Sequence, residues 1–322
     1  MKKNVFLSPS SLSALRPSGS LLLAVVGCLM LGTSPIFVCI SQMGPAGTGF
    51  YRLFLSLPLA YLWLVFERQF TPSKSYQAPT ASDRLLLIVC GLFFGLDLAL
   101  WHWSLKFTTV VNSALFNNFT AFYVSFLGWI LFSERPPYSF FLALALGLTG
   151  SFLLAGESLK LDIHNLGGDL LALASALAYS GYIMSVKSLR GRLSTATLML
   201  WSSASAGVFL FGVAFFTEET LAPSVIQDWI AVLGLALVVH IGGQGLLAYS
   251  MGQLSAVFVG FLSLLTPLIA AILAWLLFDQ TLSLSHIVGG IMILTGLTLA
   301  RLGESKRSNC SLQPAAQTKS SL

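Results

Sequence analysis

Charged residues are scarce in this chain: aspartate, glutamate, lysine and arginine together supply 9% of its 322 residues. Soluble globular proteins carry about 25%. Hydrophobic residues supply 56%, and the mean hydropathy is +0.83. So few polar side chains cannot cover the surface of a monomer in water. The composition therefore excludes an ordinary soluble protein and predicts a chain that crosses a membrane many times.

Motifs for metal, disulfide and hydrolytic chemistry are missing as well. The four cysteines form no CxxC pair and no cluster with histidine, so neither a zinc site nor a disulfide framework is indicated. The chain also lacks the GxxxxGK[ST] phosphate loop, the HExxH motif and a Ser/His elbow for hydrolysis. We therefore expect no enzymatic activity, cofactor or metal. The net charge of +5 comes from basic residues scattered between apolar runs, which does not indicate nucleic-acid binding.

What the chain has instead is a series of apolar runs, each long enough for the ~20 residues that a spanning helix needs. The first contains VVGC at 25–28, which imitates a lipoprotein cleavage box, but the run continues to Ile40 and is therefore interpreted as a span. The predicted spans are 20–40, 45–66, 85–106, 109–132, 138–156, 168–189, 195–216, 229–249, 254–278 and 284–302.

The basic residues test this count, because cytoplasmic loops of membrane proteins carry an excess of lysine and arginine. With ten spans and both termini in the cytoplasm, fourteen of the seventeen basic residues lie on the cytoplasmic side. Lys106 and Lys160 then lie in outer loops, and Arg52 lies within a span. The sequence therefore predicts an integral protein of the inner or plasma membrane with both termini cytoplasmic.

The second half of the chain repeats the first at an offset of 146 residues, so that 104–132 aligns with 250–278 without a gap. Each half has five spans, an odd number, so the second half must enter the membrane in the opposite sense. Inverted repeats place a substrate site near the membrane midplane, where the halves meet. The identical pairs include Thr120/Thr266, Trp129/Trp275, Phe132/Phe278 and Gly150/Gly296.

The predicted fold is therefore an all-α polytopic membrane protein with ten transmembrane helices arranged as two inverted five-helix repeats. Residues 1–19 form a cytoplasmic tail, 20–156 the first repeat and 168–302 the second. Residues 303–322 are rich in serine, glutamine and lysine, which predicts a disordered cytoplasmic tail.

Five stretches are typical of one family: YRLFLSLPLA at 51–60, LDLALWHWSLKFTTVVNSALFNN at 96–118, GWILFSERP at 128–136, LLTPLIAAILAWLLFDQTLS at 264–283 and GGIMILTGL at 289–297. In these the chain resembles the EamA type of the drug/metabolite transporter superfamily. The resemblance implies secondary transport, with export as the default direction, of amino acids, nucleotide derivatives, sugars or drugs. The family usually has proline in the fourth span where this chain has Ala121, although Pro267 occupies the matching place in the ninth. This departure counts against a symmetric break of the two spans.

Two charged residues lie deep in the predicted spans. At a rise of 1.5 Å per residue, Arg52 lies ~10 Å and Asp97 ~13 Å from the outer ends of their helices. A charge at the centre of a membrane helix costs ~2.5–3.5 kcal/mol on insertion scales, so each must face a partner or a polar cavity. The similar depths predict an Arg52–Asp97 pair. It either ties two helices together or forms a site where Arg52 receives an anionic group and Asp97 an ammonium group or a proton.

Further polar and aromatic residues lie at similar depth, at helical spacings that place them on shared faces. The complete set of predicted substrate-binding residues is Arg52, Asp97, Trp101, Asn117, Asn118, Tyr179, Tyr182, His240 and Gln244.

Several of these residues have a structural alternative. Asn117 and Asn118 either hydrogen-bond a ligand or join helices. His240 is either a proton relay or a packing residue. The GGQG sequence at 242–245 either loosens its helix or, as we favour, allows a neighbour to approach closely. At the outer end of the third span, interface anchors are expected: His102, Trp103 and Lys106.

Topology and repeat together predict a transporter that binds a small-molecule substrate inside the lipid bilayer, as a monomer or homodimer. The aromatic content favours a compound with an apolar part and a polar or zwitterionic head, such as an amino acid or a related metabolite. Its driving force is a proton gradient, exchange or downhill flux. The alternatives are a passive channel and a non-transporting scaffold or receptor.

Overall fold

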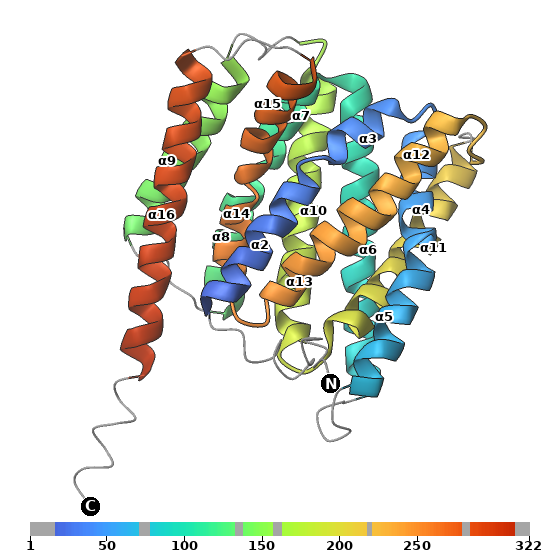
Figure 1. The fold of residues 1–322 in the computed structure, drawn as a ribbon, viewed down its shortest axis with the longest axis horizontal. Helices are drawn as coiled ribbons and strands as arrows, with labels where there is room; N and C mark the ends of the chain where they lie inside the picture. Colours follow the sequence, from blue (N-terminus) through green and yellow to red (C-terminus); the bar gives the residue numbers. More distant parts are fainter. Residues whose placement is uncertain are drawn as a thin grey trace, which may run out of the picture.

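The computed structural model describes residues 17–70, 78–132, 138–156, 163–217, 221–278 and 284–312, and the regular elements within these ranges are all helical. Long apolar runs form helices in a membrane because a helix satisfies its backbone hydrogen bonds within one segment. Figure 1 shows these helices gathered side by side in a bundle. The predicted fold class, all-α with two inverted five-helix repeats, is confirmed.

The first half of the chain supplies helices α2 to α9. The first span consists of α2 (Pro17–Leu31) and α3 (Ser34–Ile40), the second of α4 (Pro45–Phe54) and α5 (Ser56–Phe70), the third of α6 (Ala81–Phe107), the fourth of α7 (Val110–Asn117) and α8 (Thr120–Phe132), and the fifth of α9 (Tyr138–Ala155).

The second half supplies the remaining helices. The sixth span is α10 (Leu166–Arg190), the seventh α11 (Thr195–Phe216), the eighth α12 (Ile226–Gly234), η3 (Leu235–Gln244) and α13 (Gly245–Ser250), the ninth α14 (Ala256–Leu262) and α15 (Leu265–Phe278), and the tenth α16 (Leu284–Leu312). The segment η3 is a π-helix, a form that is rare and that often occurs at functional sites.

Within the described ranges, nine helical segments are long and apolar enough to cross a membrane, and the predicted ninth span contributes the shorter apolar helix Ala256–Ile269. The tenth predicted span differs most from the structure, because α16 continues past residue 302 to Leu312. Extending a helix costs less than starting one, so residues 303–312 continue α16 where a disordered tail was predicted. Residues 313–322 of that tail lie outside the described residues.

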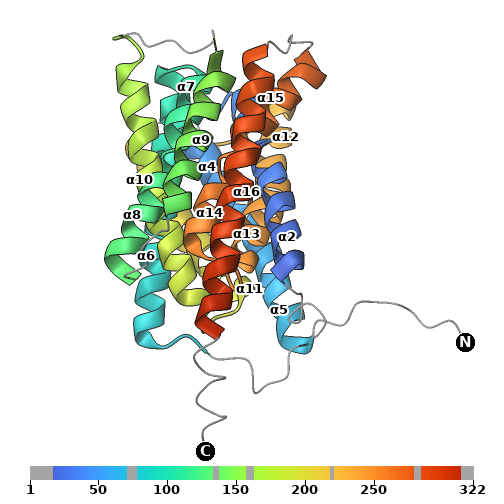
Figure 2. The ribbon, with the colours of Figure 1, turned by 90° about the vertical axis from the view of Figure 1, so that its left-hand side faces the viewer.

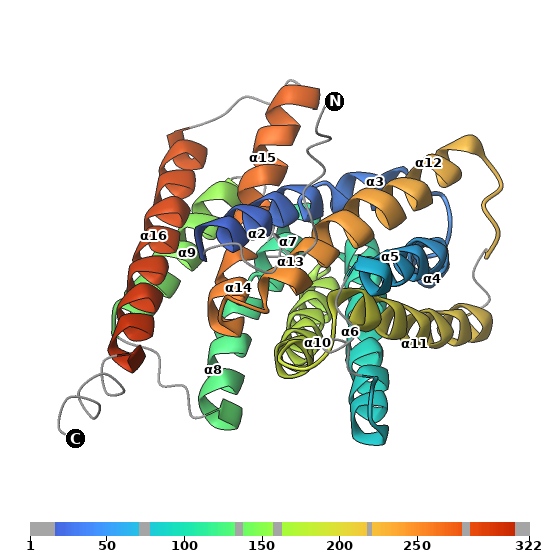
Figure 3. The same cartoon turned by 60° about the horizontal axis from the view of Figure 1, so that its bottom comes forward.

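The fifth and tenth spans pack together through glycines, and their contact shows the internal symmetry of the chain. Helices α9 and α16 lie side by side (Figures 1 and 3). A Cβ atom at Gly150 would lie 2.6 Å from Gly289 O, and one at Gly296 would lie 2.7 Å from Ala143 O. The 146-residue offset converts the first pair into the second. Equivalent residues thus make equivalent contacts, as a twofold relation between two repeats requires.

The same relation holds at the centre of the bundle. Helix α10, the first span of the second half, packs against α6, the third span of the first half. Correspondingly, α2 packs against η3 and α13. The second spans of the two halves, which include α4 and α11, pack against each other. The two repeats are therefore interleaved, with the first span of each half against the third span of the other.

The fourth and ninth spans are interrupted at corresponding places, after α7 and after α14. Each begins with a side-chain cap on its first turn. Thr109 Oγ1 accepts a hydrogen bond from Asn112 N at 3.0 Å, and Ser255 Oγ accepts one from Phe258 N at 3.1 Å. Thr109 and Ser255 are themselves separated by the 146-residue offset, so the local sequence of both repeats starts these helices in the same way.

The break in the fourth span does not need a proline. Ala121 occupies the place of Pro267, yet its N–H donates to Asn118 O, only three residues back, at 3.2 Å. Thr120 Oγ1 donates to Asn117 O at 2.7 Å and so satisfies a carbonyl at the interruption. The expectation that Ala121 counts against a symmetric break is therefore wrong.

One end of the bundle is rich in basic residues and is called the basic end here. Helices α5 and α10 end there, α6 and α11 begin there, and the start of α2 and the end of α16 lie toward the same end (Figure 2). With an even number of crossings, the first and the last helix have their free ends on the same side of the bundle. The described basic residues near this end are Arg68, Arg84, Lys187, Arg190, Arg192 and Arg301.

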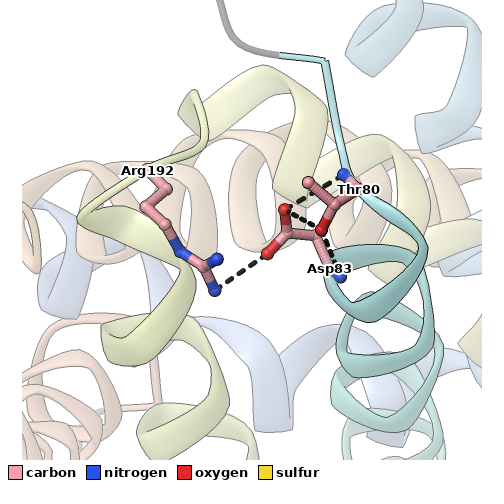
Figure 4. Close-up of polar contacts among 3 residues, drawn as sticks. All are labelled: Thr80, Asp83 and Arg192. Atoms are coloured by element: carbon pink, nitrogen blue, oxygen red, sulfur yellow. Dashed lines mark hydrogen bonds and ion pairs between the residues drawn. The ribbon is translucent and has the colours of Figure 1, made fainter.

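Figure 4 shows how helix α6 starts at the basic end. Thr80 Oγ1 accepts from Asp83 N at 3.2 Å, and Asp83 Oδ2 accepts from Thr80 N at 3.0 Å, which is a capping box. The other carboxylate oxygen, Oδ1, pairs with Arg192 Nη2 at 2.8 Å. The cap satisfies the first N–H groups of α6, and the ion pair ties that end to the connection between α10 and α11.

Candidate functional site

Phe94 on α6 is the centre of a group of buried polar and aromatic side chains. Its ring centroid lies 4.7 Å from that of Tyr182 and 5.3 Å from that of His240. The guanidinium carbon of Arg52 lies 5.8 Å from the same ring. Helices from both repeats therefore meet at this ring. We call the following residues the central cluster: Arg52, Phe94, Tyr179, Tyr182, His240 and Gln244.

The sixth and eighth spans are joined within the central cluster. Tyr179 Oη donates a hydrogen bond to Gln244 Oε1 at 3.3 Å. The rings of Tyr179 and Tyr182 stack with centroids 5.8 Å apart and planes inclined by 13°. Their three-residue spacing thus puts both tyrosines on one face of α10, as the sequence predicts, and that face is turned toward α6 and η3.

Four buried atoms of the central cluster have no hydrogen-bond partner among the described residues: Arg52 Nε, Tyr182 Oη, His240 Nδ1 and Gln244 Nε2. The four residues are each at most 3% exposed. Buried polar groups are nearly always hydrogen-bonded, because an unpaired one costs about 1–3 kcal/mol. Such groups gather where the two repeats meet, and this makes the central cluster the candidate site.

Arg52 and Asp97 do not form the predicted ion pair. In the described part of the chain, the ion pair within 4.0 Å is that of Arg192 with Asp83. Asp97 Oδ1 accepts instead from Ser175 Oγ on α10 at 2.6 Å, and Arg52 Nη1 lies 3.5 Å from Ser34 Oγ. The prediction used only the distance of each residue from the end of its helix. In the structure, Ser175 of α10 is the closer partner of Asp97.

The two asparagines of the fourth span have different partners. Asn117 Nδ2 donates to Ser175 Oγ at 2.9 Å, so Ser175 links Asn117 to Asp97 beside the central cluster. Asn118 Nδ2 lies 3.3 Å from Ser151 Oγ on α9. Asn118 therefore joins the interruption of the fourth span to the fifth span, which is the helix-joining role that the sequence left open.

Near the C-terminal end of α6, the burial of one residue differs from the prediction. Trp101 lies one turn away from Asp97 on this helix, and its ring centroid lies 5.4 Å from that of His102. His102, expected at the membrane interface, is 1% exposed, and its Nδ1 donates to Pro45 O at 2.8 Å. Helix α4 begins at Pro45 and covers this face of α6, which single-helix geometry does not show.

The eighth span carries His240 and Gln244 on its π-helical segment, η3. His240 Nε2 lies 2.8 Å from Ser203 Oγ of α11, which orients the imidazole. The GGQG sequence allows close packing, as predicted. A Cβ at Gly243 would lie 3.0 Å from Gly27 O of α2, and one at Gly242 would lie 2.7 Å from Met30 Sδ. The first span thus presses directly on the backbone of η3.

Four residues of the site are not predicted from the sequence: Ser34, Phe94, Ser175 and Ser203. Each is one of many serines or phenylalanines in apolar runs, and nothing in its local sequence distinguishes it. Their importance comes from what lies opposite them on another helix.

A family model for EamA-like transporters matches the chain twice, over residues 18–156 and 166–302. An "uncharacterized transporter" of Archaeoglobus fulgidus is 25% identical over 276 residues, which cover 86% of this chain and 94% of the relative. A protein of Salmonella typhimurium named "probable amino-acid metabolite efflux pump" is 25% identical over 301 residues, 89% of this chain and 96% of that one. One solved crystal structure shares the fold, with a TM-score of 0.73 and 17% identity over 90% of this chain and 98% of its own.

The two family matches fall on the two halves of the bundle, so one model describes both repeats. The resemblance seen in the sequence is thereby confirmed, and the family is one of transporters rather than enzymes. The chain is an integral membrane protein, and it belongs to the EamA-like transporter family.

Proposed function

We propose that this protein is a secondary transporter that moves a small amphipathic metabolite, such as an amino acid or a related compound, across the membrane by alternating access. The observation that carries this proposal is the central cluster: unpaired polar groups, buried where two inverted repeats meet. Inverted repeats bind substrate at this interface and expose it to either side by rocking of one half against the other.

The chemistry of the cluster suits an amphipathic compound. Phe94, Tyr179 and Tyr182 offer aromatic faces to an apolar part. Arg52 and Gln244 offer unpaired donors to a polar head. The name of the Salmonella relative supports an amino-acid-related compound and export. Asp97, the buried carboxylate beside the cluster, is the candidate for proton coupling.

The distribution of basic residues supports a placement in an inner or plasma membrane, with the basic end in the cytoplasm. Both termini are then cytoplasmic. Tags at residues 1 and 322 should become accessible to an impermeant label only after the membrane is permeabilised. A C-terminal tag that reacts on intact cells would contradict the even number of crossings.

Transport is tested with purified protein in liposomes. We expect saturable efflux of compounds from a loaded amino-acid mixture, and acceleration of that efflux by the same compound on the opposite side. Protein-free liposomes and heat-denatured protein serve as controls. Flux that never saturates and shows no counterflow would indicate a passive channel. Folded protein that moves no compound would indicate a scaffold or receptor.

A further inference from the structure

We infer that the central cluster recognises the carboxylate of a zwitterionic substrate, with Arg52 and Gln244 as its hydrogen-bond donors. This inference rests on the proposed function and names the chemical group that the site reads. Asp97, besides the proton coupling proposed above, supplies the charge that balances Arg52 and is not the main anchor of the ligand.

The unpaired atoms determine whether the ligand group bound here is an acceptor with negative charge or a donor with positive charge. Arg52 Nε and Gln244 Nε2 carry hydrogens and no lone pair that accepts, so each can only donate. A ligand that completes them must bring acceptors. A carboxylate has two oxygens that accept several hydrogen bonds, whereas an ammonium group has only donors. An anionic oxygen also forms the stronger, charge-assisted bond with a guanidinium.

The other two unpaired atoms, Tyr182 Oη and His240 Nδ1, can also donate hydrogen bonds. Tyr182 Oη donates or accepts. The Nε2 atom of His240 is engaged by Ser203 Oγ at 2.8 Å. When the serine hydroxyl donates there, the imidazole proton lies on Nδ1, the unpaired nitrogen, and a neutral His240 becomes a further donor. Arg52, Tyr182 and His240 each lie at the Phe94 ring, and Gln244 is joined to them through Tyr179, so one bound head group has several donors within the same neighbourhood.

Asp97 is bound to the sixth span through one of its two carboxylate oxygens. Its Oδ1 already accepts from Ser175 Oγ, and Ser175 accepts in turn from Asn117 Nδ2. Its negative charge still matters, because Arg52 and Asp97 together carry no net charge. A zwitterion preserves that balance in the low-dielectric interior, whereas a phosphate dianion would leave two uncompensated negative charges. The cluster therefore favours a carboxylate paired with an ammonium over a phosphate ester.

The first experiment separates this inference from the proposed function. Liposomes containing the protein are loaded with a small-molecule extract of bacterial cells, and mass spectrometry identifies the compounds that leave faster than from protein-free liposomes. If none leaves, the proposed function fails. If compounds leave, we expect each to carry a carboxylate. Export of carboxylate-free amines or of phosphate esters as the main products overturns the inference and leaves the transporter intact.

The second experiment measures selectivity. Each exported amino acid and its primary amide compete for counterflow of the labelled amino acid. The amide keeps the side chain and the ammonium but loses the anionic oxygens, so we expect it to compete at least roughly tenfold less well. An amide that competes equally overturns the inference.

Variants assign the selectivity to the two donors. Gln244→Leu and Arg52→Met should each reduce the discrimination between acid and amide toward one, and Arg52→Lys should restore part of it. Arg192→Gln, at the basic end, is the matched control and should keep the full ratio. A ratio of two ligands on one preparation does not depend on the yield of folded protein. If Arg52→Met fails to fold, Gln244→Leu alone decides, and a wild-type ratio in that variant overturns the assignment.

Discussion

Residues that join connections near the ends of this bundle are hydrogen-bonded through several atoms, whereas the polar residues of its central cluster leave atoms unpaired. At the end opposite the basic end, Asp228 accepts from the N–H groups of Gln42 at 2.8 Å, Ser224 at 3.1 Å and Val225 at 3.4 Å. This carboxylate therefore joins the α3–α4 connection of the first repeat to the start of α12 in the second. At the centre, by contrast, four buried groups each keep an unpaired atom.

Helix α10 shows the same contrast along a single segment. At one end, Asp169 Oδ1 accepts from Thr108 Oγ1 at 2.6 Å and from Asn112 Nδ2 at 3.1 Å. At the basic end, Lys187 Nζ donates to Met251 O at 2.9 Å and Leu254 O at 2.8 Å. Between them lies Tyr182, whose hydroxyl has no partner among the described residues.

Whether a buried polar group is satisfied or unpaired separates groups that stabilise the fold from groups that are available to a ligand. Asp228, Asp169 and Lys187 are satisfied within the chain, so their removal should lower stability. Among the described residues, two further unpaired atoms, Ser20 Oγ and His102 Nε2, lie outside the central cluster. Groups at the centre leave hydrogen-bonding capacity unused, at a cost in stability, so their removal should lower transport instead. Substitutions in the central cluster and at the ends of the bundle test this distinction.

The largest effect is expected at Asp97. Asp97→Asn removes the charge beside the central cluster but keeps an oxygen that accepts from Ser175, so the protein should insert and fold normally. Transport should fall roughly ten- to hundredfold, or lose its dependence on a pH gradient, because a buried charged partner is lost. Flux is measured at equal protein density with and without the gradient. Unchanged flux and coupling would remove Asp97 from the mechanism.

The next effect is on stability, at Asp228. Asp228→Ala leaves the Gln42 N–H and the start of α12 without their acceptor, which should cost about 2 kcal/mol. The Tm of the purified protein should fall by roughly 3 °C. Transport per folded molecule should stay near that of the wild type. If transport falls while Tm does not, the distinction between ends and centre is wrong.

A smaller effect on transport than at Asp97 is expected at Ser175. This residue is hydrogen-bonded within the chain but lies beside the central cluster. Ser175→Ala removes the hydroxyl that links Asp97 with Asn117. The hydroxyl makes two hydrogen bonds of about 1 kcal/mol each, so transport should fall no more than about thirtyfold. Ser175→Thr, which keeps the hydroxyl, is the control and should recover most of the rate. Equal loss in both variants would indicate a packing defect instead.

The smallest effect is expected at Arg192, whose side chain is 53% exposed. Arg192→Gln breaks the ion pair with Asp83 but leaves the Thr80–Asp83 capping box in place. Exposed ion pairs contribute about 0–1 kcal/mol, so both Tm and transport should change little. A loss of several degrees in Tm would show that the basic end depends on this pair.

Prediction from sequence works best where one segment decides the outcome. Tyr179 and Tyr182 share a face because both are on one regular helix. It works less well where helices meet: the sequence predicts a contact between Arg52 and Asp97, but Ser175 of α10 is the closer partner of the carboxylate. His102 is buried because α4 begins against it.

Three features of this protein follow from its amino-acid sequence: it spans a membrane, it does so a predictable number of times, and its two halves repeat in opposite senses. These features depend only on the linear order of the residues: on the length of the apolar runs, the positions of the basic residues and the 146-residue offset. Only the tertiary structure decided which polar groups are satisfied and which are not. Whether Gln244 finds partners, or Ser175 reaches Asp97, depends on side chains that other helices bring within 3–4 Å, and no local pattern encodes that distance.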